Sequence, residues 1–180
     1  IKYSSLKIEK NKNNKITNKI SSNNFLKKED VKKNFVVIKV DYANLNYKDF
    51  LMSKGHTGLI KKFPHTPGID ASGTIYYSNS KKFKKDEKVF VIAQPLGVET
   101  NGSVSEYITV PDLWIEKLPK SLTSKEIMMF GTSGFTAIKA LNKTLKTILK
   151  YKEKPVLVSG ATGNIGMIII FLLNNIGINI

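Results

Sequence analysis

The feature that most constrains this chain is a run of small residues near its C-terminal end, placed between two apolar segments. The run spans Gly160 to Gly166; Val156 to Val158 precede it, and the apolar stretch Met167 to Leu173 follows it. A β-type segment, a glycine turn and an apolar helix pattern are typical of the first unit of a nucleotide-binding α/β sheet. The pattern therefore predicts a buried strand from Pro155 and a turn whose backbone N–H groups bind a pyrophosphate at a helix N-terminus. We expect the domain it begins to continue past Ile180.

The composition limits the other kinds of site that this chain can carry. Cysteine is absent, which excludes disulfides and thiolate metal sites, and two histidines without a matching carboxylate pattern, His56 and His65, predict no metal site. The formal net charge is +15, and all 29 basic residues are lysines. Because specific nucleic-acid recognition usually employs the guanidinium group of arginine, we interpret the lysines as a solvated surface and expect no nucleic-acid partner.

The first residues and the apolar segments bear on localisation. Met167 to Leu173 is the longest apolar run and is far shorter than the roughly 20 residues of a membrane span, so we expect a soluble, cytoplasmic protein. Residues 1–28 carry eight lysines and only Glu9 as an acid, which leaves an organelle-targeting remnant as the alternative to divergent first strands. Because the chain begins at Ile1 rather than at a methionine, we expect it to be a segment of a longer protein.

Short β-type segments fill the chain up to about residue 118. Lys10 to Asn24 has the composition of an exposed hairpin or a mobile loop. Turns rich in Gly, Pro and Asn separate the segments, and this spacing predicts a small, strongly curved β-barrel over residues 1–118. Strands are predicted at residues 35–42, 69–77, 89–92 and 104–110, with a short helix after the turn at Asn44 to Asp49.

The period of the pattern changes to a helical one after residue 118. Thr123 or Ser124, together with Glu126, resembles a capping box, which predicts a helix that breaks near Gly131. A second helix is predicted from about Phe135, and residues 150–154 form a linker. The organisation we predict is a β domain over 1–118, connecting helices over 119–154 and a first βα unit over 155–180.

Four motifs follow one another along the chain: Asn46-Tyr47-Lys48-Asp49, Phe63-Pro64 with Pro67-Gly68-Ile69-Asp70, Gly131 to Ala137, and Gly160 to Gly166. Their order resembles that of the zinc-independent medium-chain dehydrogenase/reductase superfamily. The likeness covers residues 35–177 and is greatest to the quinone-oxidoreductase-like branch, particularly its acryloyl-CoA reductase subgroup. In the zinc enzymes of the superfamily, a Cys occupies the position of Asn46, and a His-Glu pair follows the Pro-Gly where Ile69 and Asp70 stand here.

The resemblance implies a fold, a cofactor and a reaction. It implies a β-rich GroES-like barrel domain followed by the start of an α/β Rossmann domain, with NADPH, or NADH, in the cleft between them. The activity it implies is hydride transfer without zinc to the activated C=C bond of an enoyl-CoA or to a quinone, by a protein that is a homodimer when full length. This segment alone is then expected to be inactive. The alternative is an inactive or truncated family member that binds nucleotide or RNA.

The resemblance also points to the residues that would contact the cofactor and substrate. Tyr47 is our first candidate beside the nicotinamide and Asn46 the second, because a developing enolate needs hydrogen-bond donors. The alternative for Tyr47 is an aromatic that anchors the short helix onto the barrel, while Asp49 is predicted to cap that helix. Thr132 and Thr136 are predicted cofactor contacts, with helix capping and packing as the alternatives.

The glycine turn completes the predicted cofactor site. It departs from the usual Gly-x-Gly-x-x-Gly pattern, with alanine at the first glycine position after Gly160, and a turn made only for packing is the alternative. The residue that would select NAD or NADP lies outside the motif. The predicted pyrophosphate-binding residues are Gly160, Ala161, Thr162, Gly163, Asn164, Ile165 and Gly166.

Two positions depart from the acryloyl-CoA reductase pattern. The loop from Glu99 to Tyr107 lacks the tryptophan of that subgroup and has Ser103 at the second of two paired glycines. Lys61 replaces an arginine, which keeps the charge but loses bidentate geometry. If this loop shapes the substrate pocket, we expect the hydride acceptor to differ from that of the acryloyl-CoA reductases.

Overall fold

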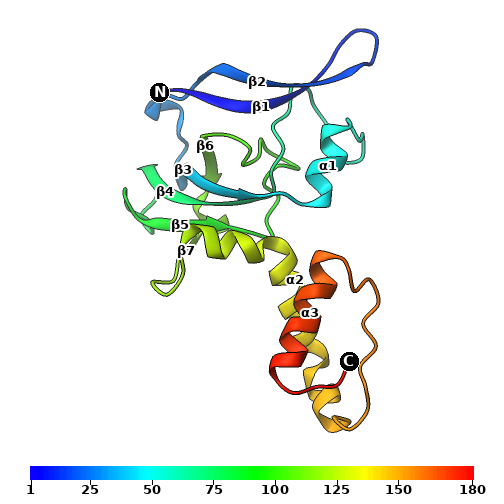
Figure 1. Ribbon diagram of the computed structural model, residues 1–180. Coiled ribbons are helices and arrows are strands. Elements are labelled where there is room, and N and C mark those ends of the chain that lie inside the picture. The colour runs from blue at the N-terminus through cyan, green and yellow to red at the C-terminus, as the bar shows by residue number, and fades with distance from the viewer. The chain divides into compact units, whose positions relative to one another are not determined.

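The computed structural model describes the backbone of residues 1–180 and every side chain except that of Asn23, and it divides into two compact units, residues 1–129 and 130–180 (Figure 1). The predicted boundaries at residues 118 and 154 stay predictions. In chain order the elements are β1 (Lys2–Lys10), β2 (Ile16–Phe25), η1 (Lys28–Asp30), β3 (Phe35–Asn44), α1 (Tyr47–Ser53), β4 (Asp70–Ser78), β5 (Lys88–Val91), β6 (Tyr107–Pro111), η2 (Asp112–Trp114), β7 (Glu116–Lys117), α2 (Ser124–Lys150) and α3 (Asn164–Asn175).

The first unit contains two antiparallel sheets, a two-stranded one of β1 and β2 and a five-stranded one in the order β6-β3-β4-β5-β7. The pairing of β3 with β4 slips twice, once between Val40 and Tyr42, as expected of the bulged, glycine-containing strand. Gly73 lies at this bulge, where a Cβ atom would meet the carbonyl oxygen of Lys39. The main core lies on the large sheet and includes Val36, Ile38, Ala71, Ile75, Phe83, Val89, Val91, Leu96, Ile108, Val110 and Ile115.

The N-terminal hairpin is tied to the rest of the first unit by backbone hydrogen bonds. The N–H of Leu6 donates to the carbonyl of Val104 at 2.9 Å, and Ile8 exchanges backbone bonds with His65 at 2.7 and 2.9 Å. A hairpin therefore forms here, and not the mobile loop that we also considered. Because Val104 bonds to the hairpin and to Pro67, β6 begins only at Tyr107, so the predicted start of that strand was wrong.

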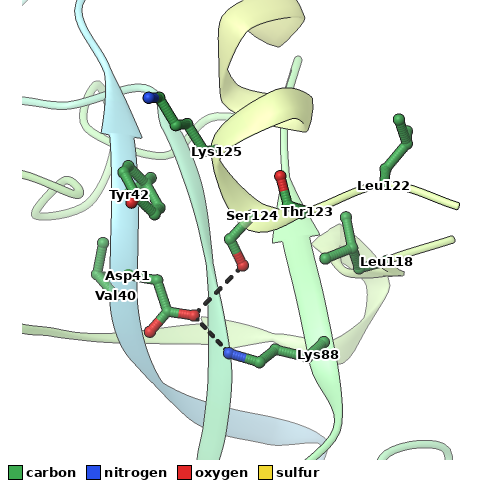
Figure 2. A pocket seen from close by; sticks show the side chains of 9 residues that line it. All are labelled: Val40, Asp41, Tyr42, Lys88, Leu118, Leu122, Thr123, Ser124 and Lys125. Atoms are coloured by element: carbon green, nitrogen blue, oxygen red, sulfur yellow. Dashed lines mark hydrogen bonds and ion pairs between the residues drawn. The ribbon is translucent and has the colours of Figure 1, made fainter. Parts of the chain in front are cut away.

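The start of α2 packs beside β3 and β5 and borders a groove of about 880 Å³ (Figure 2). The Asp41 carboxylate accepts a hydrogen bond from Lys88 at 2.7 Å and one from the Ser124 hydroxyl at 3.3 Å. The capping box is confirmed with Thr123 as the cap: its hydroxyl accepts from the Glu126 N–H at 3.2 Å, and the Glu126 carboxylate accepts from the Thr123 N–H at 2.7 Å. The Thr123 N–H and the Thr123 hydroxyl both donate to the Glu126 carboxylate, and these two bonds lower the pKa of Glu126.

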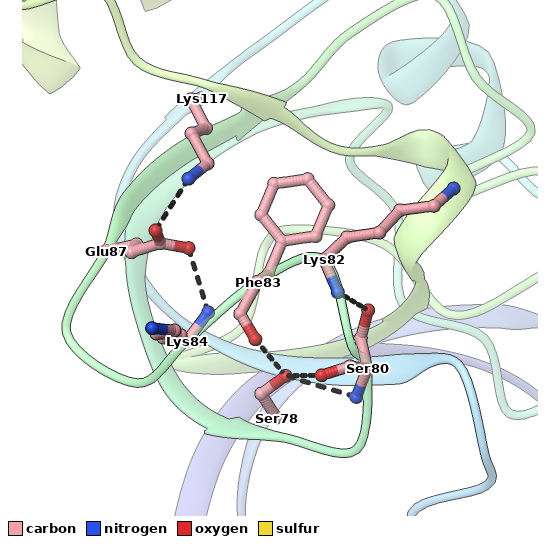
Figure 3. A network of polar contacts seen from close by, with 7 residues as sticks. All are labelled: Ser78, Ser80, Lys82, Phe83, Lys84, Glu87 and Lys117. Atoms are coloured by element: carbon pink, nitrogen blue, oxygen red, sulfur yellow. Dashed lines mark hydrogen bonds and ion pairs between the residues drawn. The ribbon is translucent and has the colours of Figure 1, made fainter.

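The lysine-rich turn between β4 and β5 is ordered by hydroxyls and by one carboxylate (Figure 3). The Ser78 hydroxyl donates to the carbonyl of Phe83 at 2.6 Å. The Glu87 carboxylate accepts from the Lys117 ammonium at 2.7 Å and from the Lys84 N–H at 2.8 Å, and the bond from Lys117 is the largest cause of a lowered pKa at Glu87. The exposed Lys117 side chain thus helps to order this turn.

The second unit consists of most of α2, the glycine turn and α3. The predicted break in α2 is confirmed, because Gly131 has φ 50° and ψ −153°, a conformation that other residues avoid. The second helical part resumes directly after Gly131 rather than at Phe135. Thr132, Ser133 and Gly134 have low helix propensity, so local propensity alone did not indicate this earlier start.

The strand predicted from Pro155 does not form, and this prediction was wrong. Residues 155–158 have no ladder partner in the part of the chain that is described, and Leu157 is 96% exposed. The N–H of Val156 instead donates to the carbonyl of Asn179 at 2.9 Å. A parallel strand needs neighbouring strands to satisfy its backbone groups, and this unit supplies none.

Candidate functional site

The turn before α1 is held by two buried carboxylates. One oxygen of Asp49 accepts the N–H of Asn46 at 2.8 Å, and the other accepts the N–H of Gly68 at 2.8 Å. Asp70 is fully buried and accepts a hydrogen bond from the Asn46 side-chain amide at 2.9 Å. The predicted role of Asp49 as the cap of α1 is thus confirmed, and its carboxylate also joins α1 to the segment that leads into β4.

Burial raises the pKa of the Asp49 carboxyl. The backbone N–H groups of Asn46 and Gly68 oppose this shift, while the nearby charge of Asp70 adds to it. Asp49 is only 4% exposed, so the turn at Asn46 rests on a carboxylate that water barely reaches. Such a group fixes backbone geometry because its hydrogen bonds have no solvent replacement.

Gly68 allows the loop over Glu99 to Tyr107 to pack directly against this turn. Its φ is +112°, and a Cβ atom there would meet the Ser103 hydroxyl. The Ser103 N–H donates to the Gly68 carbonyl at 3.0 Å, and its hydroxyl donates to the Asp70 carbonyl at 2.5 Å. Ser103, which departs from the pattern of the acryloyl-CoA reductase subgroup, therefore stabilises the backbone of Gly68 and Asp70, the two residues that contact the Asn46 turn.

Tyr47 begins α1 with its side chain in solvent. It is 73% exposed and stacks on Phe50, with ring centroids 6.1 Å apart and planes 25° apart. The interpretation of Tyr47 as an anchor onto the barrel is therefore wrong, and Met52, on the same helix, is the side chain that is fully buried. Asn46 is half-buried, so the structure brings an exposed phenol next to an amide that is fixed by Asp70.

Sequence reasoning gave no role to Asp70 or Gly68. In the zinc enzymes of the superfamily a His-Glu pair stands at residues 69 and 70, whereas here the Asn46 amide donates a hydrogen bond to the Asp70 carboxylate. A carboxylate embedded in the apolar strand after Pro67 was the signal that could have revealed this pair. Among the described side chains, no three His, Cys, Asp or Glu residues lie together, and the expectation of no metal stays a prediction.

His65 is part of the packing between the hairpin and the loops. It is 7% exposed, and its Nε2 donates to the carbonyl of Gly97 at 2.7 Å, because a carbonyl can only accept. Burial lowers the pKa of His65, and the positive charge of Lys7 adds a smaller effect in the same direction. The ring thus serves as a structural hydrogen-bond donor, and its bond to Gly97 opposes the lowering of the pKa.

The glycine turn in the second unit is shaped by its backbone. Gly160 has φ +65°, and a Cβ atom there would have no neighbour within 4 Å, so the space in front of it is open. Gly163 is the N-cap of α3, and its N–H donates to the Gly160 carbonyl at 3.0 Å. Gly166 is buried, and a Cβ atom on it would meet that same carbonyl. Seven residues are predicted to bind the pyrophosphate. The first six of them, residues 160–165, are exposed, and the seventh, Gly166, is buried.

The two threonines predicted to contact the cofactor lie one turn apart on α2, just after the kink. The Thr136 hydroxyl donates to the Thr132 carbonyl at 2.7 Å, a bond that engages its hydrogen and leaves its oxygen able to accept. Thr136 is exposed and Thr132 is half-buried. Both hydroxyls thus sit on a rigid helix in the second unit.

Comparison with known proteins gives this architecture a family. Residues 32–120 match the alcohol dehydrogenase GroES-like domain. The chain is 40% identical over 152 residues to the putative quinone oxidoreductase YhfP of Bacillus subtilis, covering 84% of this chain and 46% of that one. It is 35% identical over 142 residues to the acrylyl-CoA reductase AcuI of Ruegeria pomeroyi, covering 79% of this chain and 43% of that one.

Solved structures agree with these matches. The crystal structure of B. subtilis yhfP with NAD bound superposes with a TM-score of 0.85 at 36% identity, covering 97% of this chain and 52% of the other. The yhdH oxidoreductase from Salmonella enterica in complex with NADP gives a TM-score of 0.83 at 29% identity, with 97% and 52% covered.

These matches define a class and then a branch. The chain carries a GroES-like domain of the alcohol dehydrogenase type, followed by a second unit whose described elements are helices. It belongs to the medium-chain dehydrogenase/reductase superfamily, in the branch of the quinone oxidoreductases and acrylyl-CoA reductases. It spans about half the length of the relatives that it matches. None of the helices in the described residues is both long and apolar enough to cross a membrane.

Proposed function

We propose that the full-length protein is an NAD(P)H-dependent oxidoreductase that reduces, without zinc, the activated C=C bond of an enoyl-CoA or a quinone. The observation that carries this proposal is the turn at Asn46 and Tyr47: an exposed phenol and a half-buried amide on a frame of two buried carboxylates. Relatives named quinone oxidoreductase and acrylyl-CoA reductase support the reaction class. Solved structures with NADP or NAD bound support the cofactor.

The glycine turn has the properties that a dinucleotide needs. Gly160 leaves open space before the turn, Gly166 lets the turn lie directly on α3, and the N–H groups of Asn164 and Ile165 begin that helix. A helix N-terminus with exposed small residues binds phosphate oxygens through backbone donors. We therefore assign the pyrophosphate of NADPH to residues 160–166, and a nicotinamide contact to Thr132 or Thr136.

The turn at Asn46 would act on the substrate's oxygen. When bound, the reduced nicotinamide supplies the hydride that adds to the electrophilic β-carbon of the acceptor. Negative charge would then develop on the carbonyl oxygen, to which the Tyr47 hydroxyl and the second amide hydrogen of Asn46 would donate, and a proton from solvent would complete the reduction at the α-carbon. Because Asp49 and Asp70 fix the backbone and the amide beforehand, these donors need little reorganisation.

The test is acceptor-dependent NADPH oxidation by the full-length protein in a stopped-flow instrument. Acryloyl-CoA, crotonyl-CoA and a benzoquinone are offered separately, with NADH in parallel, and with EDTA added to remove adventitious metal. The proposal predicts rapid oxidation with at least one conjugated acceptor, unchanged by EDTA. It fails if every conjugated acceptor is inert.

A further inference from the structure

A polar cavity of about 220 Å³ lies between β1, the loop after Glu99 and β6, and shares no residue with the Asn46 turn. Tyr3, Ser5 and Lys7 alternate along β1 and so face it together. The lining includes one lysine and no carboxylate. The remaining lining residues are Thr66, Thr100, Asn101, Gly102, Ser105, Tyr107, Ile108 and Thr109.

Two hydroxyls in this lining are buried without a hydrogen-bond partner. Thr66 is 1% exposed, and neither its Oγ1 atom nor that of Thr100 has a partner among the described residues. A buried hydroxyl without a partner costs about 1–3 kcal/mol, so a ligand or water in the cavity would relieve that cost. Both hydroxyl groups are thus free to bind a ligand through their hydrogens.

The other polar groups of the lining are largely engaged in ways that leave donors available. The Asn101 Oδ1 atom accepts the Thr66 N–H at 3.1 Å, which leaves the Asn101 side-chain NH₂ for another acceptor. The Ser105 hydroxyl donates to the Tyr107 carbonyl at 2.8 Å, and Ser5 accepts from Asn24 at 3.0 Å. Donors therefore remain on Ser5, Thr66, Thr100 and the Asn101 amide, whereas Ser105, whose hydroxyl hydrogen is engaged, can only accept.

Lys7 adds a positive charge that is not neutralised within the first unit. It is half-buried, and no ion pair joins it to a carboxylate in the described residues. Glu106, a carboxylate beside the lining residues Ser105 and Tyr107 in sequence, does not line the cavity and accepts a hydrogen bond from the Ser4 N–H. Burial lowers the pKa of Lys7, as expected of an ammonium that is desolvated without a counterion.

We propose that this cavity is a second binding site, for a small oxyanion, in which the Lys7 ammonium and the hydroxyls of Thr66 and Thr100 hold the ligand. A carboxylate or a phosphate group supplies the acceptors that these donors lack. The cavity has room for several waters, each of about 30 Å³, and hence for an anion of acetate or phosphate size. The site is separate from the proposed reduction and does not depend on it.

The experiment is an NMR titration of the ¹⁵N-labelled full chain with sodium phosphate and, separately, sodium acetate, at constant ionic strength set by chloride. The proposal predicts saturable shifts of the amides of Thr66, Asn101 and Gly102. Tighter binding of phosphate assigns a phosphoryl ligand, and tighter binding of acetate assigns a carboxylate ligand. No saturable shift with either anion overturns the proposal.

Three variants separate a built site from general attraction to a basic surface. Lys7→Gln and Thr66→Val should each weaken binding about tenfold, because the first removes the positive charge and the second removes a hydroxyl donor to a charged acceptor, whereas Thr66→Ser should bind like the parent. The matched control is Lys2→Gln, an exposed lysine on the same strand that does not line the cavity. Equal weakening by Lys2→Gln and Lys7→Gln overturns the proposal, and a normal melting curve for Lys7→Gln shows that the fold is retained.

Discussion

The turn at Asn46 and the turn at Gly160 hold their shapes by opposite means. The first is built from side chains: Asp49 and Asp70 are buried, and each accepts a hydrogen bond from Asn46. The second is built from missing side chains: Gly160 has a positive φ, and Gly166 admits no Cβ atom beside the Gly160 carbonyl. The first turn should therefore be broken by removing atoms and the second by adding them.

The surroundings of the two turns differ in the same way. The Asn46 turn leads into α1, whose Met52 is buried in a core cluster with Ile60 and Ile69. Beside the glycine turn, Leu157 is 96% exposed and Phe171 is 61% exposed. The Asn46 turn is thus held by side chains within the first unit, whereas the glycine turn holds its backbone shape while the apolar side chains of Leu157 and Phe171 are exposed.

Removal of the Asp49 carboxylate should have the largest effect. Asp49→Ala leaves the buried N–H groups of Asn46 and Gly68 without acceptors, so the free energy of unfolding of the first unit should fall by about 3 kcal/mol. Urea denaturation followed by the fluorescence of Trp114, which packs against the main core, measures this. Asp30→Ala, at an exposed position, is the control and should change little. An equal effect of both substitutions would show that the carboxylate frame contributes nothing specific.

Addition of a methyl group to the glycine turn should reduce cofactor affinity. In Gly166→Ala the new Cβ meets the Gly160 carbonyl and must displace the turn, so the Kd for NADPH should rise about tenfold or more. Gly163→Ala is the graded control, because its Cβ comes only to 3.4 Å from that carbonyl. Nucleotide fluorescence titration of the full-length protein gives both values, and the assignment of the turn fails if Gly166→Ala binds NADPH as tightly as the parent.

The pH dependence of the first unit should show a smaller effect, centred on His65. Burial lowers the pKa of this ring in the folded state below its usual value of 6.5. As the pH falls below 6.5, the unfolded state therefore binds a proton more readily than the folded state does. Stability should therefore fall as the pH decreases from about 7 to about 5, and His65→Gln, which keeps a donor for Gly97, should reduce that slope. Urea midpoints at the two pH values measure it. The same substitution at exposed His56 should leave the slope in place, and a slope unchanged in His65→Gln contradicts the assignment.

Much of the fold follows from local patterns in the sequence. The capping box at Thr123, the break at Gly131 and the cap role of Asp49 are confirmed because each depends on a few neighbouring residues. The strand from Pro155 was predicted wrongly because a strand depends on partners elsewhere in the chain, and local apolar character cannot supply them. Local sequence patterns therefore predicted caps and helix breaks, but they did not predict which segments pair over long distances in the chain.

In the candidate site, too, the residues of one contiguous motif could be predicted and those distant in the chain could not. Asn46 and Tyr47 could be selected from sequence because their motif is contiguous, but their support comes from Gly68, Asp70 and Ser103, which are distant in the chain. The cavity beside Lys7 could not be predicted at all, since it combines the hairpin with a loop about 100 residues later. The assignments of Tyr47, Thr132, Thr136 and the glycine turn to cofactor and substrate stay predictions.

The most direct test of the central claim, that the framed Tyr47 hydroxyl serves the chemical step, is a single-turnover measurement of hydride transfer in Tyr47→Phe. The substitution keeps the ring that stacks on Phe50 and removes only the donor. We predict that hydride transfer to the best acceptor slows about 100-fold while the Kd for NADPH is unchanged, and that Tyr42→Phe, at another exposed tyrosine, reacts like the parent. Hydride transfer at the parental rate in Tyr47→Phe would contradict the account.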